Sequence, residues 1–335
     1  MSENKERIVF DVAYQPQVRT KVDTRRLMSD VIIACIPVAA VGIYRFGLHA
    51  LVLMLTSMAS AVFFEWGYRR LLHKSITIDD FSAAVTGLLL VMVLPPQTPW
   101  WMVVIGDFFA IVVVKQLYGG IGKNFLNPAL AGRAFLTASY AGTLTVVIVD
   151  GVTMATPLSY LYKGEALPFS MAEMFLGARV PGSIGEISAL AILAGAAYLI
   201  VRKVIRWRIP AVVIGTVALI SFLGGHAGYT RFDWMVENVL AGGVMFTGIF
   251  MATDYSTSPV TRWGQAIYGF GIGSLTMLIR YFGGFAEGCS YAILIMNLCT
   301  WALDKGCHRH QFGVSREDIA AEKAAKKAAK KEAAQ

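Results

Sequence analysis

Charged side chains are scarce in this sequence of 335 residues. Asp, Glu, Lys and Arg make up 16% of the chain, whereas hydrophobic residues make up 56%. A soluble domain of this length needs more charge to cover its surface, so one large water-soluble globule is excluded. The high apolar content also excludes intrinsic disorder. The chain is therefore expected to be an all-α polytopic membrane protein.

Cysteine is also rare, and its spacing argues against several kinds of site. Four cysteines in 335 residues do not make a disulfide-stapled scaffold. No Cys-x-x-Cys pair occurs, so an iron–sulfur or zinc site is not expected. Cys307-His308-Arg309-His310 holds suitable ligand types, but it adjoins a Lys-rich tail, and we expect no metal there. A P-loop is absent as well, because Lys123 is followed by Asn rather than Ser or Thr.

Basic residues outnumber acidic ones by 30 to 22. They lie in the tails and in short gaps between apolar blocks. This distribution argues against nucleic acid as a partner and favours the surface of a lipid membrane. Residues 1–26 begin with charge and hold no apolar core, so no cleaved signal peptide is expected.

Apolar blocks long enough to cross about 30 Å of hydrocarbon recur along the chain. Some are short, or are interrupted by Pro95, Pro96 and Pro128, so several of the helices should be broken. We expect about ten transmembrane helices, at 27–46, 48–68, 81–96, 99–118, 127–149, 183–202, 209–226, 237–254, 263–282 and 286–305.

The charges of the gaps predict the orientation, because cytoplasmic loops carry an excess of Lys and Arg. Placing the N-terminus inside puts the gaps around Arg69–Lys74, Lys123, Arg202–Arg208 and Arg262 in the cytoplasm. An even number of spans then returns the C-terminal tail to the same side. Both termini are therefore expected to be cytoplasmic, in a bacterial or archaeal cytoplasmic membrane, with 150–182 outside.

The chain resembles itself over nearly half its length. Thr86-Gly87, Pro99 and Gly119-Gly120 recur in order as Thr247-Gly248, Pro259 and Gly283-Gly284, offset by 160 to 164 residues. With five spans in each half, the second copy enters the membrane inverted, a plan common among transporters. The alternative is that these glycines only allow close helix packing. The predicted segments are 1–26, a first repeat at 27–149, the external 150–182, a second repeat at 183–305 and a tail at 306–335.

Inversion places two polar loops on the cytoplasmic side, Gly119–Pro128 and Thr253–Pro259. The first offers glycines and the donors Lys123, Asn124 and Asn127, and the second is rich in hydroxyl groups. Together they predict a ligand pocket, unless both loops merely cap helix ends. The breaks at Pro95–Pro99 and Gly283–Glu287 should form a second pocket on the external side.

Several ionisable residues lie in apolar surroundings, where charge is costly and therefore indicates function. Glu65 lies one turn before Arg69 and can pair with it. Those near span ends can reach the interface by snorkelling: Asp30, Lys115, Glu186, Arg280 and Glu287. Asp107 and Arg133 lie deeper, and they either pair with each other or belong to an ion route.

One external stretch resembles a known attachment motif. Thr153-Met154-Ala155-Thr156 is similar to the Ser/Thr-x-Ala-Thr flavinylation motif of membrane redox subunits. Thr86-Gly-Leu-Leu-Leu, Gly119–Ala129 and Thr253–Pro259 also match, and the resemblance runs from about residue 20 to 310. Together they resemble the D subunits of Rnf complexes, the ion-translocating ferredoxin:NAD oxidoreductases. The related B subunits of sodium-pumping NADH:quinone reductases usually carry an N-terminal extension longer than 26 residues, so the Rnf family is favoured.

The resemblance implies a ten-span inverted-repeat fold with covalent FMN on Thr156 and with riboflavin nearer the cytoplasm. It also implies partner subunits that carry flavins and iron–sulfur centres, and a flavin transferase for maturation. Asp150, Thr153 and Ser159 would help to present the Thr156 hydroxyl or bind its flavin. The residues expected around the second flavin are Lys123, Asn124, Asn127, Asp254, Ser256 and Thr257.

The expected function is electron transfer across the membrane by a flavin-carrying subunit that has no activity alone. Asp107 is the deepest acid and hence the candidate for attracting a compensating cation, whether Na⁺ or H⁺. The alternatives are a B-type quinone reductase subunit, an inverted-repeat solute transporter and a purely structural subunit. A transporter would need no flavin attachment, and a structural subunit would carry no chromophore.

Overall fold

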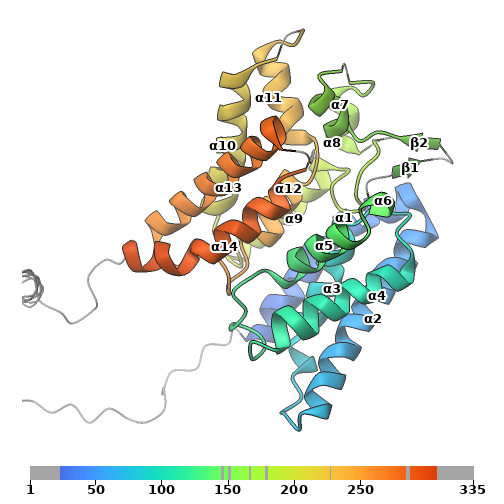
Figure 1. Cartoon of the computed structure of the whole chain (residues 1–335), viewed down its shortest axis with the longest axis vertical. Coiled ribbons are helices and arrows are strands. Elements are labelled where there is room, and N and C mark those ends of the chain that lie inside the picture. Colours follow the sequence, from blue (N-terminus) through green and yellow to red (C-terminus); the bar gives the residue numbers. More distant parts are fainter. Residues whose placement is uncertain are drawn as a thin grey trace, which may run out of the picture.

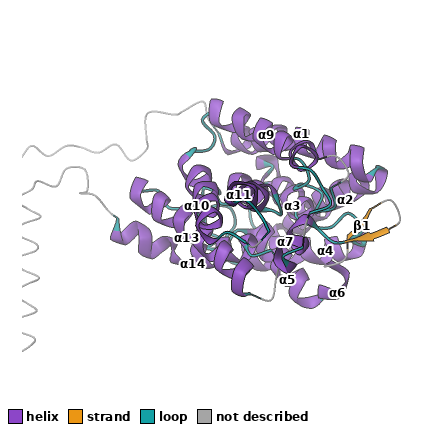
Figure 2. Cartoon of the chain, turned by 90° about the horizontal axis from the view of Figure 1, so that it is seen from above, coloured by secondary structure: helices purple, strands orange, loops and turns teal. Residues whose placement is uncertain are grey.

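The computed structural model describes residues 23–144, 147–149, 152–165, 167–177, 180–226, 228–283 and 287–307. Helices dominate these ranges (Figures 1 and 2). The α-helices are α1 (Thr24–Phe46), α2 (Leu48–Leu71), α3 (Ser82–Met92), α4 (Trp100–Phe108), α5 (Pro128–Ser139), α6 (Ala141–Leu144), α7 (Pro157–Lys163), α8 (Met171–Leu176), α9 (Ala189–Val201), α10 (Arg208–Gly224), α11 (Arg231–Leu240), α12 (Val244–Phe246), α13 (Arg262–Phe282) and α14 (Cys289–Gly306). A 3₁₀ turn covers Ile78–Asp80, and π-helical segments continue α4 over Phe109–Gln116 and α12 over Thr247–Met251.

The described residues agree with the all-α class and depart from helix at one short hairpin. Strands β1 (Val147–Val149) and β2 (Val152–Met154) form an antiparallel hairpin, with Val147 opposite Met154. The predicted span 127–149 is accordingly not one helix, because α5 ends at Ser139 and Tyr140 leaves the helical region. The β-branched run Val147-Ile148-Val149 favours a strand.

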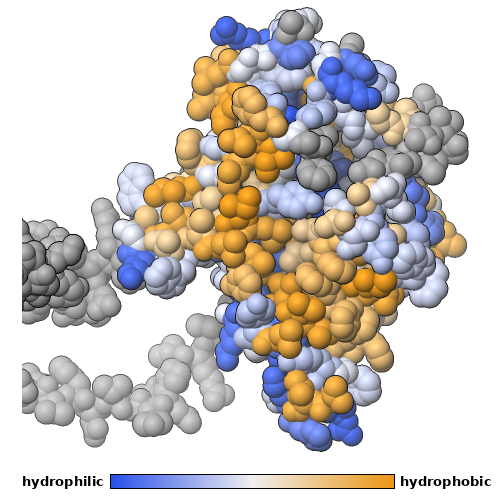
Figure 3. All heavy atoms as spheres, viewed as in Figure 1, coloured by the Kyte–Doolittle hydropathy of each residue, from blue (hydrophilic) through white to orange (hydrophobic). Residues whose placement is uncertain are grey.

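Two of the described helices, α1 and α2, are long and apolar enough to cross a membrane by themselves, in agreement with the first two predicted spans. A third such segment is the pair α11 and Val244–Met251 if it counts as one span, although it bends by 65°. Helices α3, α9 and α10 are apolar but shorter. Apolar side chains cover much of the body in Figure 3, and hydrophilic ones gather toward the ends of its long axis. The chain is a helical membrane protein with several short or broken helices.

The helices pack as two groups that share one hydrophobic core. In the first, α2 lies against α3 and α4, and in the second, α10 lies against α13 and α11 (Figures 1 and 2). Helix α1 packs on α9 and also contacts α2 and α3 of the first group. Gly87 lets α3 approach α2, because an added Cβ would lie 2.5 Å from the Ser57 carbonyl oxygen. At this glycine the close-packing interpretation of the repeat motif therefore holds.

Three of the buried charges have partners within the protein, two in ion pairs and one on main-chain carbonyls, so the expectation that they snorkel is wrong. The Lys115 ammonium lies 2.7 Å from the Glu65 carboxylate, and both side chains are almost fully buried. Asp30 pairs with Arg202 at 3.2 Å. Arg280 donates to the main-chain carbonyls at the end of α11, of residues 238 and 241. These contacts satisfy charges that would be costly to bury alone.

Candidate functional site

Thr156 lies at the junction between β2 and α7, where it forms the N-cap of the helix. Its Oγ1 accepts from the Ser159 backbone N–H at 3.3 Å and lies 2.9 Å from Ser159 Oγ. Pro157 follows at the first helical position, where a missing N–H costs nothing. The structure thus places Ser159 directly against Thr156. Thr153 lies in β2, and Asp150 lies outside the described residues.

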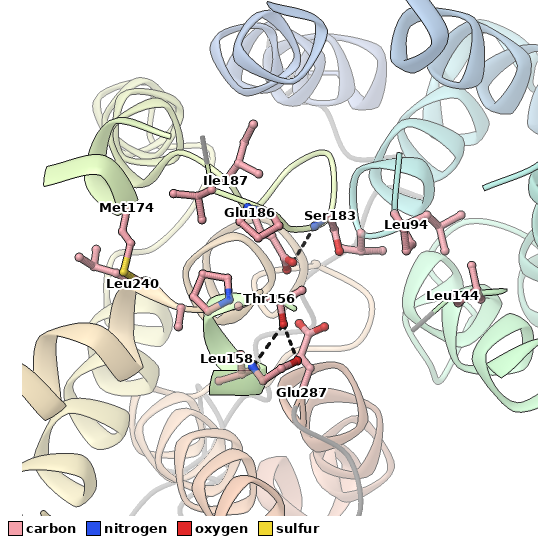
Figure 4. Close-up of a pocket in the computed structure, with 18 of the residues that line it drawn as sticks. Leu94, Leu144, Thr156, Leu158, Met174, Ser183, Glu186, Ile187, Leu240 and Glu287 are labelled. Carbon is pink, nitrogen blue, oxygen red and sulfur yellow. Dashed lines mark hydrogen bonds between the residues drawn. The ribbon is translucent and has the colours of Figure 1, made fainter. Parts of the chain in front are cut away.

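Thr156 faces a cavity of about 190 Å³, which we call the Thr156 pocket. Figure 4 shows Glu186 and Glu287 pointing toward Thr156 from two sides. Apolar side chains supply much of the remaining wall, so the cavity combines apolar surface with a few polar groups, as ligand sites do. The wall includes Val93, Leu94, Arg133, Thr137, Leu144, Leu158, Met174, Val180, Ser183, Ile187 and Leu240.

The backbone on one side of the Thr156 pocket is built by a broken helix. Helix α3 stops at Met92, and a turn before α9 provides partners for the carbonyls at and just beyond this end: Ile184 N–H donates to Leu94 O at 3.1 Å and Gly185 N–H donates to Met92 O at 2.7 Å. The final carbonyls of a helix need partners of this kind when they are buried. The arrangement explains why the predicted span 183–202 is helical only from Ala189, and it directs Glu186 into the cavity.

Charge in the Thr156 pocket is concentrated on Arg133, Glu186 and Glu287, of which only Glu287 belongs to a break predicted to line an external pocket. Arg133 pairs with Glu287 and donates to Ser290 Oγ at 2.5 Å. Glu287 also accepts from the Gly243 N–H at 3.1 Å. One oxygen of Glu186 accepts from the Ser183 N–H at 2.7 Å, and the other has no hydrogen-bond partner among the described residues. For Arg133 and Glu186 the sequence signal was only that the charge lies in apolar surroundings.

A second cavity, the Asn127 pocket, has a volume of about 90 Å³ and lies where the two polar loops meet. Asn127 caps α5 by accepting from the Leu130 N–H at 3.2 Å, and its amide donates to Met251 O at 3.1 Å. Asn127 therefore links the start of α5 to the end of the π-helical segment Thr247–Met251. Asn124 also lines the cavity, and its amide donates to Leu126 O at 3.0 Å.

Asp254 and Ser256 form the facing wall of the Asn127 pocket. The Asp254 carboxylate accepts from the Ser256 hydroxyl at 3.1 Å and from the Thr257 hydroxyl at 3.2 Å. Thr257 lies behind the wall rather than in it, and Lys123 is exposed outside the cavity. The structure thus brings together four of the six residues expected here and leaves these two out.

Five further polar residues line this cavity. Thr253 and Tyr255 belong to the second predicted loop, whereas Ser82 and Thr86 of α3 and Lys115 at the end of the π-helical segment lie outside both loop motifs. The Tyr255 hydroxyl donates to Val204 O. Burial, with Asp30 adding to it and Arg206 opposing it, raises the pKa of the Tyr255 phenol and keeps it a neutral donor.

Asp107 lies in α4 with 0% exposure, and it does not pair with Arg133. Its carboxylate is instead 3.0 Å from Ser57 Oγ and accepts from Ser60 Oγ, while Ser57 Oγ also lies 2.7 Å from Gly87 O. The predicted alternative of an Asp107–Arg133 pair is therefore wrong. Asp107 stands within a cluster of oxygen atoms between α2, α3 and α4.

No group of three or more His, Cys, Asp and Glu side chains in the described part of the chain is arranged to hold a metal ion. The His308 and His310 of the candidate tail motif lie outside that part.

Comparison with known proteins agrees with the family that the sequence motifs resemble. The model of the NQR2, RnfD, RnfE family matches residues 11–313. The D subunit of a Na⁺-translocating ferredoxin:NAD⁺ oxidoreductase complex from Acetobacterium woodii is 46% identical over 312 residues, covering 91% of this chain and 96% of that protein. Its proton-translocating counterpart from Clostridium ljungdahlii is 41% identical over 326 residues, covering 92% and 97%. The D subunit of an ion-translocating oxidoreductase complex from Shewanella frigidimarina is 33% identical over 345 residues, covering 91% and 99%. The chain belongs to the NQR2, RnfD, RnfE family.

Proposed function

We propose that this chain is the D subunit of an ion-translocating ferredoxin:NAD⁺ oxidoreductase complex, in which it carries flavin and passes electrons across the membrane. The observation that carries the proposal is Thr156, which ends a Ser/Thr-x-Ala-Thr motif and faces a cavity of mixed apolar and charged walls. Relatives named as D subunits of such complexes cover nearly the whole chain. The B subunit of a sodium-pumping NADH:quinone reductase is the second candidate, because the matching family includes both.

The fold of this subunit is proposed to be ten spans in two inverted repeats of five. This arrangement is supported by the two pockets, each of which lies between the end of a helix in one half and the start of a helix in the other half. The Thr156 pocket lies between the end of α3 and the start of α14, whereas the Asn127 pocket lies between the end of Thr247–Met251 and the start of α5. In each case a helix that stops inside the protein faces a helix that starts there, as repeats related by an in-plane two-fold axis require.

The two pockets are proposed to open toward opposite sides of the membrane. The charge of the loops supports a cytoplasmic position for both termini and for the Asn127 pocket, and an external position for Thr156. An external Thr156 is also where a transferase acting outside the membrane would reach it.

The Thr156 pocket fits a covalently held FMN. The Thr156 hydroxyl points into the cavity, Leu94, Leu144 and Leu158 offer apolar surface for a ring system, and Arg133 is a cation of the wall. A Thr hydroxyl is a weak nucleophile by itself, so a separate transferase must join the FMN phosphorus to Oγ1, with release of the hydroxyl proton and of the nucleotide that carried the FMN. When bound, the flavin would supply electron transfer.

The Asn127 pocket fits a second, neutral flavin such as riboflavin. Asn124, Asn127, Ser256 and Tyr255 offer amide and hydroxyl partners for a ring edge and a ribityl chain, without a phosphate-binding set of cations. Trichloroacetic acid extraction of the purified subunit, followed by chromatography, tests this second site. Release of riboflavin is expected, and an extract without flavin would remove the proposal.

The covalent assignment is tested by intact mass before and after phosphodiester cleavage. The mass should fall by that of one FMN less one water, and the fragment bearing Thr156 should carry the modification. A solute transporter would show no such mass, and its denatured, washed protein would not absorb visible light.

Ion coupling is proposed to involve Asp107. An electron that crosses this subunit moves negative charge through a low-dielectric region, which favours a compensating cation. Asp107 is buried beside the hydroxyls of Ser57 and Ser60 and the carbonyl of Gly87. Carboxylate, hydroxyl and carbonyl oxygens are the ligand types that hard cations take.

A further inference from the structure

The loop between α9 and α10 forms a strongly basic depression with the start of α13. Four cations line it, Lys203, Arg206, Arg208 and Arg262, and its volume is about 420 Å³. We call it the basic hollow. Arg206 Nη1 donates to Val260 O at 3.3 Å and thereby ties the loop to the residues before α13. Among the described residues none of the four cations has an acidic partner.

The backbone of the basic hollow is strained at Lys203. Helix α9 ends with Arg202 as its C-cap, and Lys203 follows with φ +57°. Glycine is the usual residue at this left-handed position, because a Cβ there is unfavourable. Glycine would adopt this conformation at a lower conformational cost. A lysine here therefore suggests a functional role for its side chain.

Exposed apolar side chains continue from the basic hollow along the outer face of α13. Trp263, Ile267 and Phe270 follow one face of α13, and Trp263 is 69% exposed. Trp207 stands in the hollow and is 61% exposed. Tryptophan gathers where the hydrocarbon of a membrane meets its headgroups. Within the described part of the chain, the hollow therefore combines cations that have no acidic partner with an apolar stripe of the kind that contacts acyl chains.

We propose that the basic hollow binds the phosphate headgroup of an anionic phospholipid, with an acyl chain along Trp263, Ile267 and Phe270. Free phosphate would use the cations but not the apolar stripe. An acidic partner protein of the complex would not need tryptophan at this depth. Each cation near an anionic lipid surface contributes enough that its loss is expected to weaken binding about fivefold.

The test uses the purified full-length chain in neutral detergent. Its melting temperature is measured with added phosphatidylglycerol, phosphatidylcholine or inorganic phosphate, and retained lipid is counted by native mass spectrometry. Phosphatidylglycerol alone should raise the melting temperature, with one or two anionic lipids retained. Arg206→Gln with Arg262→Gln should lose both effects.

Lys203→Gly separates binding from folding. It should raise the melting temperature without lipid, because it relieves the positive φ, but it should reduce the shift caused by phosphatidylglycerol. His73→Gly is the matched control, since His73 also has a positive φ of 50° and lies at the end of α2, outside the basic hollow. It should be stabilised without losing the lipid response.

Three results would overturn the proposal. One is a full phosphatidylglycerol shift in the double variant. Another is an equal shift with inorganic phosphate, which would assign the hollow to a soluble anion. The third is an unchanged lipid response in a double variant that no longer assembles with the other subunits, which would make the hollow a protein interface.

Discussion

Thr156 is at once the proposed attachment site and the N-cap of α7, so its substitution has two consequences that must be separated. Thr156→Val should abolish covalent flavin, measured as in-gel fluorescence, because no hydroxyl remains to form the phosphoester. It should also cost about 1 kcal/mol of stability through the lost cap. Thr156→Ser keeps both the cap and the hydroxyl and should keep its stability.

Thr230→Val is the matched control for this experiment. Thr230 caps α11 by accepting from the Asp233 N–H at 3.1 Å, but it belongs to no flavinylation motif. The control should lose a similar amount of stability and fluoresce normally. Normal fluorescence in Thr156→Val would reject the attachment site.

Asp107→Asn tests the proposed role of the buried carboxylate. The amide keeps the size of the side chain and can bond Ser57 and Ser60, but it carries no negative charge to attract a cation. Ion translocation and turnover should fall about tenfold, equivalent to roughly 1.4 kcal/mol, with flavin content and assembly intact. The measurement is ion uptake by proteoliposomes of the complex. Wild-type uptake would reject the role, and lost assembly would assign Asp107 to packing.

At the scale of elements, Asn127 connects two broken helices through the oxygen and the nitrogen of its side-chain amide. Its oxygen caps α5 and its nitrogen donates to Met251 O. Asn127→Asp should keep the cap and lose the donor, whereas Asn127→Ala should lose both. Each hydrogen bond contributes about 1 kcal/mol, so the melting temperature should fall in two steps. Thermal unfolding of both variants checks this, and equal losses would show that the link to Met251 contributes nothing.

Elements with a local signature could be predicted from the sequence. Helices α1 and α2 follow from unbroken apolar runs, and the loops of the Asn127 pocket follow from their polar composition. The end of α3 could not be predicted, because its carbonyls are satisfied by Ile184 and Gly185, about ninety residues later. Strand β1 was missed because its apolar residues continue the pattern of the preceding helix.

The contrast between local signatures and contacts of distant segments also separates the site residues that could be predicted from those that could not. Thr156 and Ser159 are three residues apart, so a motif can contain them. Arg133 and Glu287 meet across 154 residues, and Glu186 joins them from a third segment. Nothing local pairs these charges, and each has a separate explanation when it is taken alone. Their meeting depends on how the two halves pack around the Thr156 pocket.

For the molecule as a whole, the inverted repeat predicts which loops face which side. Lys163 at the end of α7 and Lys123 in the loop before α5 are both exposed, and the proposed topology places the first outside and the second inside the cell. Cysteine introduced at either position, in a variant without the native cysteines, reports its side through a membrane-impermeant maleimide. Lys163→Cys should react in intact cells, whereas Lys123→Cys should react only after the membrane is opened. Denatured protein controls for thiol reactivity. Labelling of both positions in intact cells would place the two pockets on one side, and electron transfer between them would then carry no charge across the membrane.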